Sequence, residues 1–166
     1  EIARLDGMLG EMLALSRMEG GLPGMDSEQV ELADVVTDCL EQSRLDADAQ
    51  QVDLRLTCVD SAVVCGNRLL LERALDNLLT NAIKFSPPGG TVEVILRVDA
   101  QRFAEISLRD NGPGVPEEEL AQLFRPFFRG SNASRAEGHG LGLAIVDRVV
   151  RVHGGTIAVN NVDGGG

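Results

Sequence analysis

The chain has 166 residues, enough for one domain with a hydrophobic core and a short appendage. Its 26 acidic and 15 basic residues give a formal net charge of -11, which argues against a surface for nucleic acid or an anionic membrane. No apolar run is long enough to span a bilayer, and the three cysteines have no metal-site spacing, which favours a reduced cytosolic compartment.

Residues 1–20 are predicted to form a helix without a partner of its own. The apolar residues of one face recur at intervals of three and four positions: Ile2, Leu5, Leu9 and Met12. One such stripe does not stabilise an isolated helix in water, so we expect a second helix outside the segment to cover it. A linker rich in glycine follows over 21–28, and we expect the folded domain over 29–166, truncated before its last strand.

Between residues 30 and 65 the hydrophobic pattern predicts a strand, a helix and two further strands. Val30–Leu32 is expected to be a short strand, and Ala33–Gln50 an amphipathic helix. The side chains expected to face inward on this helix are Val35, Val36, Cys39, Leu40 and Leu45. Alternation over Val52–Leu56 predicts a strand, and Ala62–Cys65 is expected to be a short buried one.

The stretch Asn67–Phe85 is predicted to be one long helix with two distinct faces. The apolar face has helical spacing and comprises Leu71, Ala74, Leu75, Leu78, Leu79, Ala82 and Ile83. On the other face Asn77, Asn81 and Lys84 follow one another by about one turn, so their side chains line up. An amide oxygen can bind a hard cation such as magnesium, and an ammonium can neutralise phosphate. The alternative is an ordinary solvated polar face, and this helix alone does not decide between them.

The remaining elements are a pair of strands and two short helices. Val92–Val98 and Phe103–Leu108 predict an antiparallel hairpin. Helices are expected over Glu117–Leu123 and Leu141–His153, and a further strand over Thr156–Val159. The sequence therefore predicts an α+β fold. We expect a two-layer α/β sandwich, with a mixed, mostly antiparallel sheet covered on one face by helices and preceded by a partial coiled-coil helix.

Two glycine-rich turns are candidates for nucleotide contacts. In Asp110–Gly114 the Asp110 carboxylate can accept a hydrogen bond from an exocyclic amine, and the glycines let the backbone pass close to a flat ring. Gly138–Leu143 precedes a helix, where free backbone N–H groups and the helix dipole attract phosphate. The alternatives are an ordinary Asp-Asn-Gly turn and a glycine-rich hinge.

A cluster of phenylalanines lies between these two turns. Leu123–Arg129 holds three of the five phenylalanines, and we expect it to form a small hydrophobic cluster beside the main core. Arg129 at its end can reach phosphate. The following segment, Arg129–Gly138, lacks apolar anchors, so we expect it to be mobile.

Taken together and in order, the four motifs resemble the N, first glycine, F and second glycine boxes of bacterial two-component sensor histidine kinases. The resemblance covers essentially the whole chain, and among these kinases it is nearest to the envelope-stress sensors of Gram-negative bacteria. It implies the Bergerat-type ATP-binding fold shared with gyrase, heat-shock chaperone and mismatch-repair ATPases, with ATP and Mg²⁺ as cofactors. It also implies that residues 1–20 are the C-terminal end of the second helix of a dimerisation and phosphotransfer hairpin.

The resemblance also implies roles for individual residues. Catalytic roles fall to Asn77, Lys84 and Arg129, and the magnesium ligand is Asn81, with Asn77 in support and Lys84 facing the phosphates. The adenine side of the site comprises Phe85, Asp110, Gly112 and Gly114, with Asp110 receiving the adenine amine. Arg129–Gly138 corresponds to the ATP lid. The phosphates are wrapped by the glycine loop, which comprises Gly138, His139, Gly140, Leu141, Gly142 and Leu143.

The histidine that accepts phosphate in such kinases has no counterpart in the chain. His139 lies in the glycine loop and His153 ends a helix, so neither fits. We therefore expect the catalytic ATP-binding domain of a protein-histidine kinase, which transfers the γ-phosphate to a histidine outside this segment for relay to a response regulator. The full-length protein is expected to be a homodimer anchored in the bacterial inner membrane, with this domain in the cytoplasm. The segment alone is expected to be a monomer.

Two alternative functions stay open from the sequence. The first is an ATPase of the gyrase or chaperone type. Those enzymes place a glutamate one turn before the magnesium-binding asparagine, where this chain has Asn77, and an amide is a poor general base. The second is a module that senses nucleotide without catalysis. Asn77 favours phosphoryl transfer to a protein side chain over hydrolysis.

Overall fold

The computed structural model of the protein describes residues 27–58, 60–131 and 138–162. Its elements in chain order are β1 (Glu28–Glu31), α2 (Leu32–Gln50), β2 (Asp53–Cys58), β3 (Val63–Gly66), α3 (Arg68–Phe85), β4 (Thr91–Val98), β5 (Ala104–Arg109), α4 (Glu117–Leu120) and α5 (Gly142–Val152). The helix predicted over 1–20 and most of the predicted linker lie outside the described residues.

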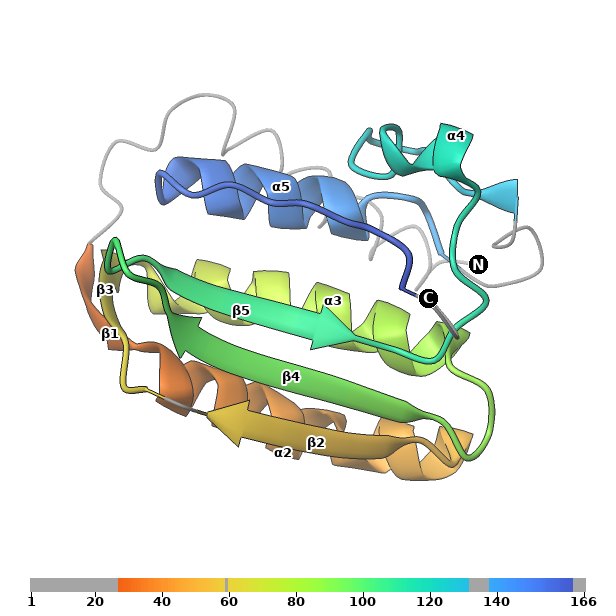
Figure 1. The fold of residues 1–166 in the computed structure, drawn as a ribbon, viewed down its shortest axis with the longest axis horizontal. Helices are drawn as coiled ribbons and strands as arrows, with labels where there is room; N and C mark the ends of the chain where they lie inside the picture. Colours follow the sequence, from red (N-terminus) through yellow and green to blue (C-terminus); the bar gives the residue numbers. More distant parts are fainter. Residues whose placement is uncertain (1–26, 59, 132–137, 163–166) are drawn as a thin grey trace, which may run out of the picture.

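A three-stranded sheet in the order β2-β4-β5 forms one layer, and α2 and α3 lie behind it in Figure 1. β2 pairs with β4 in parallel, which places Leu54 opposite Val92. β5 pairs with β4 in antiparallel fashion, which places Leu108 opposite Val94. β1 and β3 form a separate antiparallel pair at one end of the molecule. The predicted two-layer α+β fold with a mixed sheet is confirmed.

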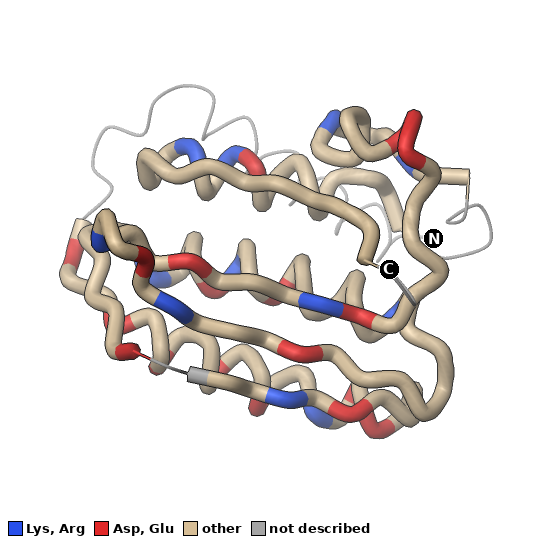
Figure 2. The backbone as a smooth tube through the Cα atoms, viewed as in Figure 1, with Lys and Arg blue, Asp and Glu red and all other residues tan. Residues whose placement is uncertain are grey.

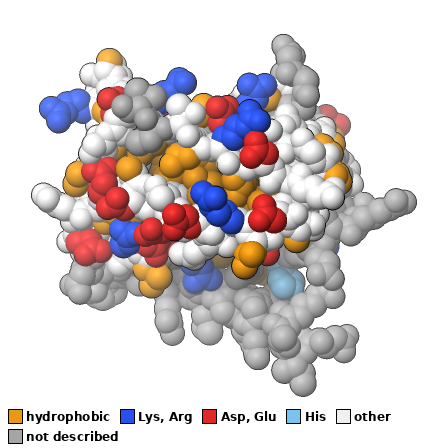
Figure 3. Space-filling model, turned by 90° about the horizontal axis from the view of Figure 1, so that it is seen from below, with side chains coloured by type: hydrophobic (Ala, Val, Ile, Leu, Met, Phe, Trp, Pro, Cys, Tyr) orange, Lys and Arg blue, Asp and Glu red, His pale blue; other side chains and the backbone are white. Residues whose placement is uncertain are grey.

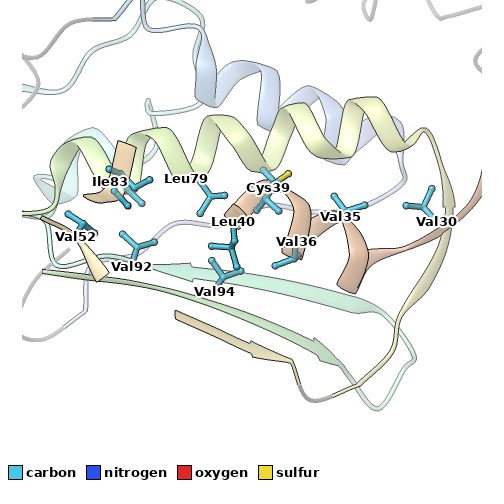
Figure 4. Packing of buried hydrophobic residues seen from close by; sticks show 13 residues of the cluster. Val30, Val35, Val36, Cys39, Leu40, Val52, Leu79, Ile83, Val92 and Val94 are labelled. Carbon is cyan, nitrogen blue, oxygen red and sulfur yellow. The ribbon is translucent and has the colours of Figure 1, made fainter. Parts of the chain in front are cut away.

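The hydrophobic core lies between this sheet and the helices α2 and α3 (Figure 4). Three alternate residues of β4 are fully buried, Val92, Val94 and Leu96, because alternate side chains of a strand point to the same face. Val92 and Val94 of β4 belong to the same buried cluster as Val36 of α2 and Leu79 of α3. Cys39 packs among them as a small apolar side chain, and burial raises the pKa of its thiol to about 12, so the thiol stays protonated.

Helix α3 has the two faces that its sequence predicts. Asn67 is its N-cap, and the Asn67 side-chain oxygen accepts a hydrogen bond from the Leu70 N–H at 3.0 Å. The buried residues of the helix are Ala74, Leu75, Leu79, Ala82 and Ile83, all from the predicted apolar face. This packing fixes the rotation of α3 about its axis. The polar side chains of Asn77, Asn81 and Lys84 are therefore held at a partly exposed edge of the core.

Two predictions about burial were wrong. Leu45 of α2 was expected to face inward, but it is 80% exposed, and Ala47 takes the inward position. Leu45 lies about 140° around the helix from Leu40, whereas Ala47 lies within about 20° of it. The strand at residues 62–65 was expected to be buried. Instead β1 is the one partner of β3 within the described residues, and Val63 is 58% exposed because this small pair leaves one face to solvent.

Two predictions about the last elements also need correction. The helix expected over Glu117–Leu123 ends at Leu120, and three-residue turn hydrogen bonds such as Leu123 N–H to the Leu120 carbonyl continue the chain. The strand expected over Thr156–Val159 is not formed. Alternation alone could not decide this, because a strand also needs a partner edge, and Ile157 instead packs on the cluster shared by α3 and α5.

None of the charged residues that the structure describes is buried, and acidic and basic positions are interspersed along the strands and helices (Figure 2). Figure 3 shows the underside, where Figure 1 places α2 and β2, with hydrophobic side chains gathered in the middle of the face between acidic and basic ones. Leu45 of α2 and Leu56 of β2 are among the exposed large hydrophobic residues. Among the described residues, no helix combines the length and the apolar character needed to cross a bilayer.

Candidate nucleotide-binding site

One groove of about 1280 Å³ gathers every residue that the sequence singles out for nucleotide binding. It runs along α3, beside β5 and the turns that follow it, and extends the length of α5 to His153 and the segment over 154–161. Its lining includes Asn77, Asn81, Lys84, Phe85, Asp110, Gly112, Gly114, Arg129, Gly138, His139, Gly140, Leu141, Gly142 and Leu143. The fold thus brings together four motifs that are far apart in the chain.

Helix α3 supplies the polar side chains of one wall. The Asn77 amide nitrogen donates to the Arg73 carbonyl at 2.8 Å, which leaves the Asn77 oxygen turned toward Gly142. The Asn81 side chain makes no hydrogen bond with the residues that the structure describes. The Lys84 ammonium lies 5.1 Å from the centre of the Phe85 ring, within the range of a cation–π contact. The Asn81 amide and the Lys84 ammonium both line this wall of the groove.

The turn after β5 presents a carboxylate in a fixed orientation. One oxygen of Asp110 accepts the Gly112 N–H at 2.7 Å, which leaves the other oxygen for a ligand. A Cβ on Gly112 would lie 2.6 Å from this Asp110 oxygen and 3.2 Å from the Phe85 carbonyl. Only glycine allows the turn to approach the end of α3 so closely. The carboxylate and the Phe85 ring consequently share one end of the groove.

The glycine loop over 138–143 depends on backbone conformations that favour glycine. Gly138 and Gly140 have φ values of 146° and 71°. The Gly140 carbonyl accepts the Phe127 N–H at 2.8 Å, and a Cβ on Gly140 would lie 2.6 Å from the Phe128 carbonyl. The loop leads into α5, whose first turn has no side-chain cap. Its backbone N–H groups and the positive end of the helix dipole are therefore available to an anion.

Three of the predicted site residues differ in what they can present to the groove. Leu141 is 1% exposed, so only its backbone can face a phosphate. Arg129 is exposed where the chain leaves the phenylalanine cluster, and it lines the groove. Gly138 resumes the described chain at the other end of the predicted lid, whose middle lies outside the described residues.

Two residues that make structural contacts at the edges of the groove were missed by the sequence analysis. Phe127 has a φ of 66°, an uncommon conformation for this residue type, and its N–H is the donor to Gly140. His153 was considered only as a phosphate acceptor, but its ring contacts the N-terminus of α3. No local sequence pattern indicates the Phe127 conformation. For His153 there is a signal, because Gly66 directly precedes the N-cap of α3, and a glycine at that position can indicate a close contact with another side chain.

The donor set at the polar end of the groove fits a magnesium ion that is shared with phosphates. The described residues contain no cluster of three or more histidine, cysteine or acidic side chains suited to hold a metal by themselves. Magnesium usually keeps several waters and takes one or two protein oxygens together with phosphate oxygens. The Asn81 amide, which lines the groove without a hydrogen bond to the described residues, suits that role.

Asp110→Asn is expected to weaken ATP binding by roughly 10- to 150-fold, from a loss of about 1.5–3 kcal/mol for a hydrogen bond to a charged group. The amide can keep its oxygen on the Gly112 N–H, so it would present an NH₂ group to the adenine amine, and two donors would meet. Titrations of ATP and GTP measure the effect. Equal weakening of both nucleotides would show that Asp110 does not read adenine.

Comparison with known proteins places this site among ATPases. Residues 66–166 match the family model described as histidine kinase-, DNA gyrase B- and HSP90-like ATPase. Over its full length the chain is 39% identical to the signal transduction histidine-protein kinase/phosphatase MprB of Mycolicibacterium smegmatis. It is 37% identical to the protein of the same name from Mycobacterium avium. The chain spans 33% and 31% of the lengths of these two relatives.

Solved structures give the same result. The mycobacterial sensor histidine kinase MprB is 39% identical, with a TM-score of 0.72 over 76% of this chain and 82% of that one. The cytoplasmic segment of histidine kinase QseC is 28% identical, with a TM-score of 0.68 over 100% of this chain and 89% of that one. Full-length ShkA in complex with AMPPNP has a TM-score of 0.85 at 23% identity, over 97% of this chain and 34% of that one, and supports the fold alone.

Proposed function

Because the chain belongs to the family of histidine kinase-, DNA gyrase B- and HSP90-like ATPases, and is a catalytic ATP-binding domain of the histidine kinase type, we propose that the whole protein transfers the γ-phosphate of ATP to a histidine outside residues 1–166. The observation that carries the proposal is the gathering of the α3 amides, the Asp110 turn and the glycine loop in one groove. In the full-length protein the phosphate passes to a response regulator.

The geometry of the groove supports a role for each of its walls. The free oxygen of Asp110 accepts the exocyclic amine of adenine, with the Phe85 ring beside the base. Lys84 and Arg129 offset the negative charge of the phosphates, and the N–H groups at the start of α5 receive phosphate oxygens. Asn81 holds a magnesium ion, which when bound neutralises charge on the phosphate oxygens. Asn77 supports the glycine loop through its contact with Gly142.

Phosphoryl transfer of this kind requires positioning and charge neutralisation more than covalent chemistry by the domain. The nucleophile is an imidazole nitrogen on a separate helical hairpin, and residues 1–20 are the end of its second helix, joined by the linker 21–28. The hairpin makes the full-length protein a homodimer. The protein is anchored in the bacterial inner membrane, and this domain lies on the cytoplasmic side.

The geometry of Asn77 argues against an ATPase. Its amide nitrogen donates to the backbone of its own helix, and its oxygen faces Gly142. An amide in this arrangement cannot take a proton from water, so hydrolysis should be slow. A histidine brought in by the hairpin is itself a strong nucleophile and does not need that base.

The test is to follow the label from γ-labelled ATP with magnesium. The chain alone should bind ATP without becoming labelled. Adding a separate hairpin protein that carries the acceptor histidine should produce an acid-labile label on the hairpin and none on this chain. Asn81→Ala with the same hairpin is the control and should give no label. Stable label on this chain alone would contradict the proposal, and rapid release of free phosphate without the hairpin would favour an ATPase.

A further inference from the structure

We propose that His153 is a positioning residue for nucleotide binding. Its neutral imidazole fastens the end of α5 to the N-terminus of α3 and thereby holds the glycine loop, at the other end of α5, against Asn77. This inference rests on the proposed nucleotide site. It adds a residue of the same groove that lies at the opposite end of α5 from the glycine loop.

The hydrogen bonds of the ring define its protonation state. The Nδ1 atom lies 2.7 Å from the Val149 carbonyl oxygen, which can only accept, so Nδ1 carries the proton. The Nε2 atom accepts the backbone N–H of Asn67 at 3.0 Å. Both bonds can form together only in the neutral ring with its proton on Nδ1. A proton added to Nε2 would face the Asn67 N–H and break that contact.

The ring is seated against a glycine that leaves room for it. A Cβ on Gly66 would lie 2.5 Å from Cδ2 and 2.7 Å from Nε2 of His153. Gly66 is buried and directly precedes Asn67, the N-cap of α3. The imidazole is thus held between the last turn of α5 and the residue pair that begins α3. A side chain at position 66 would displace it.

The two helices lie side by side, so this contact controls the position of the distant loop (Figure 1). Ala74 of α3 packs against Ile145, Val146 and Val149 of α5. At the far end, a Cβ on Gly142 would lie 2.7 Å from the Asn77 side-chain oxygen. Each helix covers about 15 Å between its two contacts, at about 1.5 Å per residue. Loss of the His153 contact would free α5 to slide along α3 and move the loop.

The charged groups around the ring do not replace this contact. Arg151 on α5 is paired with Asp147 at 2.8 Å. Arg68 on α3 is paired with Glu72 at 2.6 Å and with Asp38. Further titratable groups close to these residues are Cys65 on β3, Arg148 on α5 and Glu28 of β1, which is the register partner of Gly66.

The test measures nucleotide affinity at pH 8 by calorimetric titration of ADP with magnesium. Circular dichroism checks the folding of every variant. His153→Leu removes the acceptor and should bind about tenfold more weakly at pH 8. His153→Gln keeps an acceptor for the Asn67 N–H, so it should bind within about threefold of the parent.

Gly66→Ala displaces the ring without changing it, so it should weaken binding as His153→Leu does, and the double variant should be no weaker than either single one. Val152→Ala, at a 42% exposed neighbour, is the matched control and should bind as the parent does. Unchanged affinity of a folded His153→Leu protein, additive effects with Gly66→Ala, or a loss in His153→Gln as large as that in His153→Leu would each overturn the inference. A parent that bound no nucleotide would instead overturn the proposed function.

Discussion

Asn81→Ala is expected to abolish magnesium-dependent ATP binding and leave the fold intact. Asn81 lies on the partly exposed face of α3, and the core residues of this helix are on the opposite side, so its truncation opens no cavity. Residues that only support a metal ligand already contribute about 10- to 100-fold to metal affinity. The loss of a direct ligand should therefore exceed about 100-fold.

A titration of ATP with magnesium, repeated with a chelator, separates this role from a general loss of affinity. The variant should match the wild type in the chelator and differ from it only when magnesium is present. Arg73→Ala is a suitable control, because Arg73 lies on the same helix and outside the groove lining. An unchanged affinity of Asn81→Ala with magnesium would show that Asn81 is not the ligand.

Gly140→Ala is expected to destroy the glycine loop. The residue has a φ of 71°, which costs an L side chain about 1–2 kcal/mol. The added Cβ would also lie 2.6 Å from the Phe128 carbonyl and 2.8 Å from the Phe127 carbonyl carbon. Both are backbone atoms and cannot rotate away, so the loop must move away from the phenylalanine turn, which is the backbone of Phe127 and Phe128. We expect more than a tenfold loss of ATP affinity and a lower melting temperature.

Gly89→Ala separates the two causes. Gly89 has a similar φ of 80°, but its added Cβ would meet no atom within 4 Å. This variant should lose about 1–2 kcal/mol of stability and keep its ATP affinity. Similar affinity losses in both variants would show that backbone strain alone, and not the contact with the phenylalanine turn, accounts for the effect.

The sequence predicted the fold best where one period determines the packing. In α3 the helical period fixed both faces, and Ala74, Leu79 and Ile83 are buried as expected. Prediction failed where a second element decides the outcome. The exposure of Val63 depends on what covers β3, and strand formation at Thr156 depends on whether a partner edge is available. Neither fact is contained in the local pattern.

The candidate site followed a similar rule. The residue types that contact a nucleotide, such as Asn81 and Asp110, stand in recognisable motifs, and the structure gathers all of them in one groove. The residues that fix these motifs relative to one another do not stand in recognisable motifs. Phe127 acts through a backbone conformation and His153 through a contact with a helix that is distant in sequence. Such roles emerge only when the elements are packed.

The parallel pairing of β2 with β4 has a consequence for how the domain folds. Parallel neighbours cannot be joined by a tight turn, and here the crossover over residues 59–90 includes β3 and the whole of α3. The conformational entropy lost in closing this long loop is not offset until the β2–β4 contacts form. Folding of the domain should therefore be slow compared with a helical bundle of similar size. Because α3 is itself the crossover, its amides reach their final places in the same step that assembles the sheet. The unfolded chain therefore has no preformed fragment of the site with which to capture a nucleotide early.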